Sequence, residues 1–146
     1  MSKLTLDDNT LREILTTSKV IAVVGHSDKP ERTSYQIAQF LRQVGYTTIP
    51  VNPSVSEIDG QRSYASLRDV PEPVDIVNVF RRSEYVSEIV DAAIAIQAKT
   101  IWTQLGICDT PSAQKALAAG LNVIMNACIK IEYHQLEINR SNELLD

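Results

Sequence analysis

The segment from Gly25 to Ser34 reads G-H-S-D-K-P-E-R-T-S and gathers residue types that bind phosphate groups. A glycine lets the backbone turn sharply and come close to a ligand. The hydroxyl groups of Ser27 and Ser34 can hydrogen-bond to phosphate oxygens. Lys29 and Arg32 add positive charge, which Arg presents through two parallel donors. This segment, named the glycine loop from here on, therefore predicts a phosphate site.

The charges of the glycine loop also admit a purely structural interpretation. Lys29 and Arg32 balance Asp28 and Glu31, so the loop is formally neutral. On that interpretation the four side chains only solvate a surface loop, and a phosphate would be held mostly by backbone amides. His26 has no carboxylate at a spacing that would orient it, so we expect a solvated loop residue rather than a general acid or base.

Strand-like apolar runs alternate with segments of helical period along the chain, a pattern typical of a mostly parallel α/β sheet. Ser34 is the expected N-cap of a helix that Gly45 closes. The expected strands are 19–25, 46–51, 60–64, 74–80, 100–105 and 121–125. Further helices are expected at 7–17, at 66–70, from Ser83, from the N-cap Thr110 to Ala119, and at 129–136.

Ligands of open parallel sheets bind beyond the carboxyl ends of the strands, where the strand order reverses. The loops in that position are 25–34, 52–54, 80–83 and 104–108. The first free amides of the helix at Ser34 suit an anion there. We therefore expect one Rossmann-like, doubly wound α/β domain over residues 1–146, with helices on both faces, a core over about 15–136 and a polar tail at 139–146.

The residues after the first two strands bear on which nucleotide would bind. A nicotinamide site of this fold needs G-x-G-x-x-G after the first strand and an acidic residue ending the second. Gly25 is followed by no such glycines, and the second strand ends in Asn52-Pro53. No glycine precedes the Lys-Ser or Lys-Thr of a phosphate-binding Walker motif. NAD and ATP are disfavoured, and an NAD(P)-dependent reductase stays as the alternative function.

The composition excludes several other classes of protein. A net charge of −4 disfavours a nucleic-acid binder. The apolar runs are too short to span a membrane, and the first residues lack the apolar stretch of a signal peptide, which predicts a cytoplasmic protein. Cys108 and Cys128 are expected to be reduced thiols, and with two histidines and no His/Cys cluster we expect no metal site.

Four motifs together resemble the small stand-alone CoA-binding proteins, relatives of the CoA-binding domain of the succinyl-CoA synthetase α-subunit. They are I-A-V-V-G-x-S-x-K-P-E-R-x-S-Y at 21–35, I-P-V-N-P at 49–53, P-V-D-I-V-N-V-F-R at 73–81 and W-T-Q-L-G at 102–106. The resemblance runs from about residue 15 to 136, and it is specific in the joint order and spacing of the motifs. It implies coenzyme A as the ligand.

The resemblance also implies roles for individual residues. The phosphates would lie in the glycine loop, against Gly25, Ser27, Lys29, Arg32 and Ser34. Six residues from three later loops would surround the rest of the CoA: Asn52, Pro53, Phe80, Arg81, Gln104 and Gly106. Asn52 and Pro53 would face the ribose or its 3′-phosphate. Phe80 and Arg81 would flank the adenine or the pantetheine. Gln104 and Gly106 would lie near the pantetheine. Core packing for Phe80 and a structural hydrogen bond for Gln104 are the alternatives.

The same resemblance limits the activity. The synthetases carry a phosphorylated histidine on a second domain, for which this chain has no room. We therefore expect no catalytic residues, and a carrier, sensor or accessory module for CoA or acyl-CoA, with an enzyme of acyl-CoA metabolism as a possible partner. The chain departs from the family's pattern at M-N-A-C-I-K (125–130), where the relatives carry Arg and Pro. Cys128 is expected to stay reduced rather than form a mixed disulfide with CoA.

Overall fold

Five strands pair in parallel to form the central sheet, seen here in a computed structural model that describes residues 4–138. Their order in space is β2 (Thr47–Val51), β1 (Val20–Val24), β5 (Ile76–Val79), β6 (Thr100–Thr103) and β7 (Asn122–Ile124). This arrangement confirms the predicted Rossmann-like α/β fold. The predicted polar tail over 139–146 lies outside the described residues.

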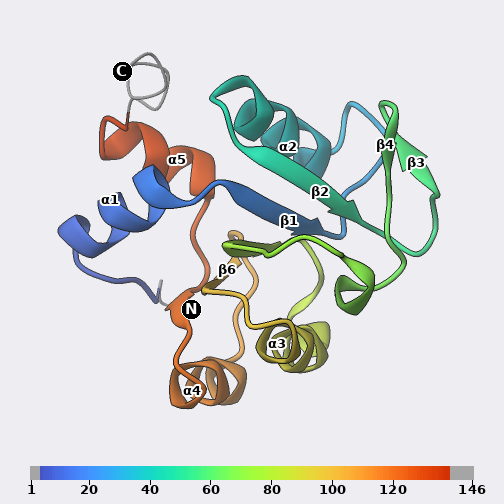
Figure 1. Cartoon of the computed structure of the whole chain (residues 1–146). Coiled ribbons are helices and arrows are strands. Elements are labelled where there is room, and N and C mark those ends of the chain that lie inside the picture. The colour runs from blue at the N-terminus through green and yellow to red at the C-terminus, as the bar shows by residue number, and fades with distance from the viewer. Residues whose placement is uncertain (1–3, 139–146) are drawn as a thin grey trace.

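Helices cover both faces of the sheet, as the continuous apolar runs of its central strands require. On one face lie α1 (Asp8–Thr17), α2 (Thr33–Gln43) and α5 (Ile129–Gln135), packed on a core cluster that includes Ile21 and Trp102. On the other lie α3 (Val86–Ala95) and α4 (Thr110–Ala118), packed on a cluster that includes Val77 and Ile101. Figure 1 shows the two layers on opposite sides of the strands.

The helix starts correct two of the predicted caps. The N-cap of α2 is Arg32, and Ser34 lies inside the helix. The Ser34 hydroxyl instead accepts the N–H of Ser27, so the loop uses the oxygen that would have capped the helix. The N-cap of α4 is Asp109 rather than Thr110, because the Asp109 carboxylate reaches the N–H of Ser112.

Three further segments are shorter or tighter than predicted. The strand expected over 60–64 is β4 (Gln61–Arg62), which forms a hairpin with β3 (Glu57–Ile58), and Tyr64 makes a single parallel bridge to Val51. The helix expected over 66–70 is the 3₁₀ turn η1 (Leu67–Asp69). The helix expected from Ser83 begins as the 3₁₀ turn η2 (Ser83–Tyr85), because the Ser83 hydroxyl accepts the N–H of Cys108 instead of capping α3.

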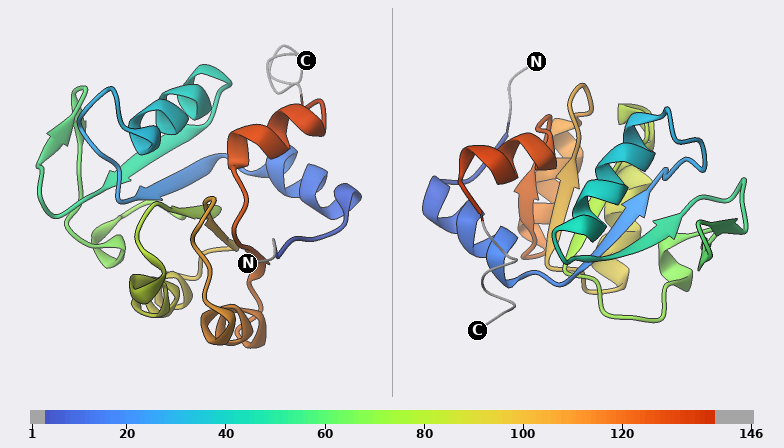
Figure 2. Two further views of the ribbon diagram at one scale, coloured as in Figure 1. Left: turned by 180° about the vertical axis from the view of Figure 1, so that it is seen from behind. Right: turned by 90° about the horizontal axis from the view of Figure 1, so that it is seen from above.

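The strand order reverses at β1. The chain leaves β1 for β2 on one side and returns to β5 on the other, so the loops after β1 and β5 diverge at one edge of the sheet. Figure 2 (right) shows the glycine loop and the loop after β6 along this edge. The helices within residues 4–138 are all too short or too polar to cross a membrane.

Candidate functional site

Gly25 occupies the tightest position of the loop that follows β1. Its φ of +89° lies in the left-handed region, and its N–H donates to the carbonyl of Val51 at 2.8 Å. A Cβ atom there would lie 2.9 Å from the carbonyl oxygen of Phe80 and 3.1 Å from Cδ of Arg81. Only glycine satisfies both constraints, and it brings the loop directly against the end of β5.

Two serines hold the rest of the glycine loop against the start of α2. The Ser34 hydroxyl accepts the N–H of Ser27 at 2.9 Å, and the Ser27 hydroxyl accepts the N–H of Lys29 at 3.1 Å. A turn then closes between the Arg32 N–H and the Lys29 carbonyl, at 3.0 Å. The loop is therefore held in shape by its own hydrogen bonds.

The amino end of α2 opens into this loop without a capping side chain. Its N-cap Arg32 makes no side-chain hydrogen bond, and its first turn holds no acidic residue, whereas carboxylates cap α1 and α4. Such an end presents free N–H groups and a partial positive charge. Within residues 4–138, Lys29 and Arg32 form no ion pair, so the two cations are not used up by Asp28 or Glu31.

A hollow of about 600 Å³, the loop hollow, lies over this helix end. It brings together seven of the predicted site residues: Gly25, Ser27, Lys29, Arg32, Ser34, Asn52 and Phe80. Thr33 and Glu31 also line it, and neither was predicted. The carboxylate of Glu31 keeps the local charge low, so an anion here depends on the α2 amides as well as on Lys29 and Arg32.

His26 is fully buried, which corrects the expectation of a solvated loop residue. Its Nδ1 lies 2.8 Å from the Ser27 carbonyl and therefore carries the proton, and its ring meets Tyr35 edge-on at 6.0 Å. Nε2 has no partner among the described residues. Burial lowers the pKa of His26, against a smaller opposing effect of the Ser27 carbonyl. The side chain is thus a neutral packing element beneath the loop.

Asn52 ties the loop after β2 to the glycine loop. Its Nδ2 donates to the His26 carbonyl at 2.8 Å, and its Oδ1 accepts the N–H of Ser54 at 2.9 Å. The side-chain amide is therefore engaged within the protein at both ends. Asn52 also lines the loop hollow. The position needs a side chain that donates one hydrogen bond and accepts another. An amide can do both, whereas an ionised carboxylate can only accept.

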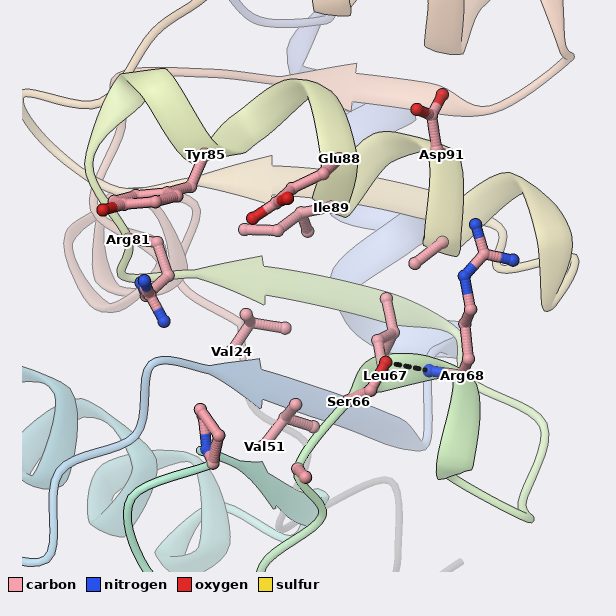
Figure 3. A pocket seen from close by; sticks show the side chains of 13 residues that line it. Val24, Val51, Ser66, Leu67, Arg68, Arg81, Tyr85, Glu88, Ile89 and Asp91 are labelled. Carbon is pink, nitrogen blue, oxygen red and sulfur yellow. Dashed lines mark hydrogen bonds between the residues drawn. The ribbon is translucent and has the colours of Figure 1, made fainter.

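A second hollow, the sheet-face hollow, lies between η1 and α3 and measures about 500 Å³. Val24, Val51 and Ile89 give it an apolar floor, and the predicted residues Pro53 and Arg81 line it. Figure 3 shows Arg81 beside Tyr85 near the strand ends and Arg68 at the opposite end.

The Arg81 guanidinium is held over the ring of Tyr85, 4.4 Å from its centroid. Ser66, Arg68, Tyr85 and Glu88 also line this hollow and were not predicted, because they meet only when η1 packs against α3.

A third hollow, the hairpin hollow, lies between the 53–56 segment and the strand β4 and measures about 800 Å³. The polar part of its lining consists of hydroxyl-bearing residues, one arginine and one carboxylate: Ser54, Ser56, Ser63, Tyr64, Arg62 and Asp69. The Arg62 guanidinium lies 4.8 Å from the centroid of the Tyr64 ring. The sheet-face and hairpin hollows share Pro53 and Ala65 in their walls.

Gln104 and Gly106 line none of these hollows. The Gln104 amide donates to Asn78 and accepts the N–H of Ile129 at 3.3 Å. The Gly106 N–H donates to Oδ1 of Asn126 at 2.7 Å. The structure thus gives both residues internal hydrogen bonds, and a contact of either with pantetheine stays a prediction.

The chain has relatives among known proteins along most of its length. Residues 19–134 match the family model of the CoA binding domain. This chain belongs to the CoA-binding domain family. The uncharacterized protein YneT of Bacillus subtilis is 41% identical over 123 residues, which are 84% of this chain and 91% of YneT.

Two archaeal proteins extend the comparison. A hypothetical protein from Pyrococcus horikoshii OT3 has a TM-score of 0.88 and 35% identity, covering 94% of this chain and 100% of its own. The α-subunit of the acetate–CoA ligase (ADP-forming) II of Pyrococcus furiosus is 29% identical over 69 residues. That match covers 47% of this chain and 15% of the ligase subunit, so it reaches only part of the CoA-binding domain described here.

Proposed function

We propose that this protein binds coenzyme A or an acyl-CoA at the edge of the sheet around Asn52-Pro53, and that it does so without catalysis. The observation that carries the proposal is the meeting of three hollows at this dipeptide. Asn52 lines the loop hollow, and Pro53 lines both the sheet-face and hairpin hollows. The adenosine ribose of CoA likewise carries three groups: a base, a 3′-phosphate and a 5′-pyrophosphate.

The pyrophosphate fits the loop hollow. The uncapped start of α2 offers free amides, and Lys29 and Arg32 offer charges that no ion pair neutralises within the described residues. Backbone amides and a helix dipole are a common phosphate site. The chain's overall charge of −4 does not attract an anion, so the pyrophosphate would have to be held by the α2 amides together with Lys29 and Arg32.

The adenine fits the sheet-face hollow. A flat apolar floor of Val24 and Val51 suits a purine ring, and Arg81 with Tyr85 closes the hollow at the strand ends. Its volume lies in the range typical of small-molecule sites. Arg81 also touches the position of Gly25, which makes the path from this hollow to the loop hollow short.

The 3′-phosphate fits the hairpin hollow. Arg62 supplies a guanidinium there, and the exposed hydroxyls of Ser54 and Ser56 supply donors. NAD and ATP have no 3′-phosphate and would leave this hollow unused, which is why CoA is the better match. The Pyrococcus furiosus relative, named as an acetate–CoA ligase, supports the same ligand class. Because this chain corresponds to a small part of that ligase, we propose an accessory or carrier role alongside an enzyme of acyl-CoA metabolism.

Titration calorimetry with CoA and dephospho-CoA tests the proposal. We expect CoA to bind about tenfold more tightly, since a charged hydrogen-bonded contact contributes about 1.5 kcal/mol or more. Arg62→Gln should remove most of this difference, whereas Arg82→Gln, an exposed residue paired with Glu84, should not. Equal affinity of the parent for both ligands contradicts the 3′-phosphate assignment. Absence of binding to either, or equally tight binding of NADH, contradicts the proposed function.

A further inference from the structure

The hairpin of β3 and β4 turns at Asp59 and Gly60, which have positive φ values of +51° and +82°. Two-residue hairpin turns need positive φ at both positions and favour Asp-Gly. Each strand is very short, and an isolated two-stranded hairpin is marginally stable at best. The position of this hairpin, which projects beside α2 at the edge of the sheet (Figure 1), therefore depends on contacts with the rest of the protein.

Asp59 at the tip of the hairpin contacts two residues on one side of α2. The Tyr35 hydroxyl donates to Oδ2 of Asp59 at 2.5 Å, and Nη2 of Arg42 lies 3.5 Å from the same oxygen. Tyr35 and Arg42 are about two helical turns apart and so share one face of α2. One carboxylate therefore holds the hairpin tip along two turns of the helix.

Gln61 continues this connection one residue before Arg62. Its Oε1 accepts from Nη1 of Arg42 at 3.4 Å, and its Nε2 donates to the Thr48 carbonyl at 3.2 Å. Successive side chains of a strand point to opposite faces, so anchoring Gln61 on the α2 side turns Arg62 the other way, into the hairpin hollow. Arg42 is thereby paired, whereas Arg62 forms no ion pair with any residue of 4–138 and rests over the Tyr64 ring.

Tyr35 also belongs to the support of the glycine loop. It follows Ser34, whose hydroxyl accepts the N–H of Ser27, and its ring meets the His26 ring edge-on at 6.0 Å. The start of α2 therefore supports both the loop hollow and the hairpin. The pyrophosphate and the 3′-phosphate of CoA are joined through a single ribose, so the groups that bind them must keep a fixed spacing.

Resting on the proposed function, we propose that Asp59 is a positioning residue that sets the preference for CoA over dephospho-CoA. Through Tyr35 and Arg42 it holds the hairpin where Arg62 meets the 3′-phosphate of a CoA whose pyrophosphate lies in the loop hollow. Asp59 does not line the hairpin hollow, so it acts through Arg62 rather than on the ligand. Dephospho-CoA lacks the 3′-phosphate and gains nothing from the position of the hairpin.

Four variants separate this role from a general one. Asp59→Gly removes the carboxylate and keeps the turn, because glycine adopts positive φ freely. Asp59→Asn keeps an acceptor for the Tyr35 hydroxyl and also tolerates positive φ, but it loses the ion pair with Arg42. Tyr35→Phe removes only the hydroxyl and keeps the ring against His26. The control, Glu57→Gln, removes an exposed carboxylate from the same hairpin and leaves both contacts of Asp59 in place.

Calorimetry with CoA and dephospho-CoA measures the effect of each variant on the preference. For Asp59→Gly we expect the preference for CoA to fall from about tenfold to about threefold or less, while the affinity for dephospho-CoA changes by less than about twofold. Asp59→Asn should fall between this variant and the parent. Tyr35→Phe should lower the preference too, and combining it with Asp59→Gly should lower it no further, because both changes remove the same contact. Glu57→Gln should not lower it.

Amide hydrogen exchange in the ligand-free protein tests the position of the hairpin without CoA. The Ser63 N–H, directly after β4, donates to the Ser56 carbonyl at 2.9 Å. The Phe80 N–H donates to the Val24 carbonyl at 2.8 Å in the sheet. In Asp59→Gly we expect the Ser63 amide to exchange at least about threefold faster and the Phe80 amide to exchange as in the parent. Unchanged exchange at Ser63 contradicts the positioning role.

The outcomes separate this inference from the proposed function. If the parent prefers CoA and Asp59→Gly keeps the full preference, the inference is wrong and the proposed function stands. A loss of affinity that is equal for both ligands also overturns the inference, because it indicates a general structural effect. If the parent binds neither ligand, the proposed function fails and the inference fails with it.

Discussion

Gly25 is the residue whose substitution the structure constrains most tightly. An added Cβ would meet the Phe80 carbonyl oxygen at 2.9 Å, and φ is +89°. We expect Gly25→Ala to lower the free energy of unfolding by about 3 kcal/mol, because steric overlap adds to the backbone strain of about 1–3 kcal/mol. Gly60→Ala is the control, since Gly60 has a similar φ of +82° and open space around it. Urea unfolding measures both, and equal losses would contradict the role of the close approach.

His26 makes the stability of the protein depend on pH. Burial lowers the pKa of the folded-state imidazole below 6.5. Between that lowered pKa and 6.5, the imidazole is therefore protonated in the unfolded chain but neutral in the folded one. The free energy of unfolding should therefore decrease as pH falls below about 6.5, by up to about 1.4 kcal/mol for each pH unit until the folded-state pKa is reached.

His26→Phe should remove this part of the pH dependence, because an aromatic side chain remains and the proton-binding group is lost. His134→Gln, which replaces the exposed histidine of α5, is the control variant. Urea unfolding at several values between pH 5 and 7.5 compares the three proteins. A parallel decline in the parent and in His26→Phe would show that other groups cause the decrease.

At the scale of elements, Asp75 joins the starts of three strands. Its carboxylate accepts the N–H groups of Lys19 and Val20 at 2.8 and 2.9 Å and pairs with Lys99 at 3.4 Å. Burial alone would raise the pKa of Asp75, but these hydrogen bonds and the Lys99 charge outweigh it and lower the pKa below 3.8. The stabilisation is therefore present above about pH 3.8 and is lost as pH falls through the lowered pKa.

Asp75→Asn should lower the free energy of unfolding by about 1–3 kcal/mol at neutral pH, since one oxygen becomes a donor facing N–H groups or the Lys99 ammonium. The difference from the parent should narrow as the solution is acidified toward pH 3. Asp28→Asn, at an exposed position, is the matched control. Thermal unfolding followed by circular dichroism gives both comparisons. A gap that stays constant down to pH 3 would mean that the carboxylate charge is not what stabilises the strand starts.

At the scale of the whole molecule, the sequence predicts the sheet well because each strand carries its own signal. Runs such as V-I-A-V-V and I-V-N-V are buried on both faces, and Gly45 ends α2 with a φ of +104° as expected. The loop hollow follows from the same logic, since its residues are nearly all consecutive. The N-cap of α2 could not be predicted in this way, because the Ser34 hydroxyl accepts the N–H of Ser27, seven positions away, instead of capping the helix.

The rest of the site depends on contacts between distant segments. The sheet-face hollow forms only when η1 packs against α3, and no sequence pattern around Ser66 or Tyr85 predicts that packing. The burial of His26 likewise depends on Tyr35 and on Asn52, which binds its carbonyl from the end of another strand. Residue type and spacing therefore identify the glycine loop, and tertiary structure alone identifies the walls opposite it.

The position of β1 between β2 and β5 has a consequence for how the chain folds. Val24 pairs with Val51 on one side and with Val79 on the other. During synthesis β1 can pair with β2 as soon as both strands have been made. The other edge of β1 has no partner strand until residues 76–79 have been made. Such an open apolar edge invites pairing with other chains. Since Gly25 packs against the Phe80 carbonyl and the Phe80 N–H bonds to Val24, the glycine loop lacks one of its supports until β5 has paired with β1.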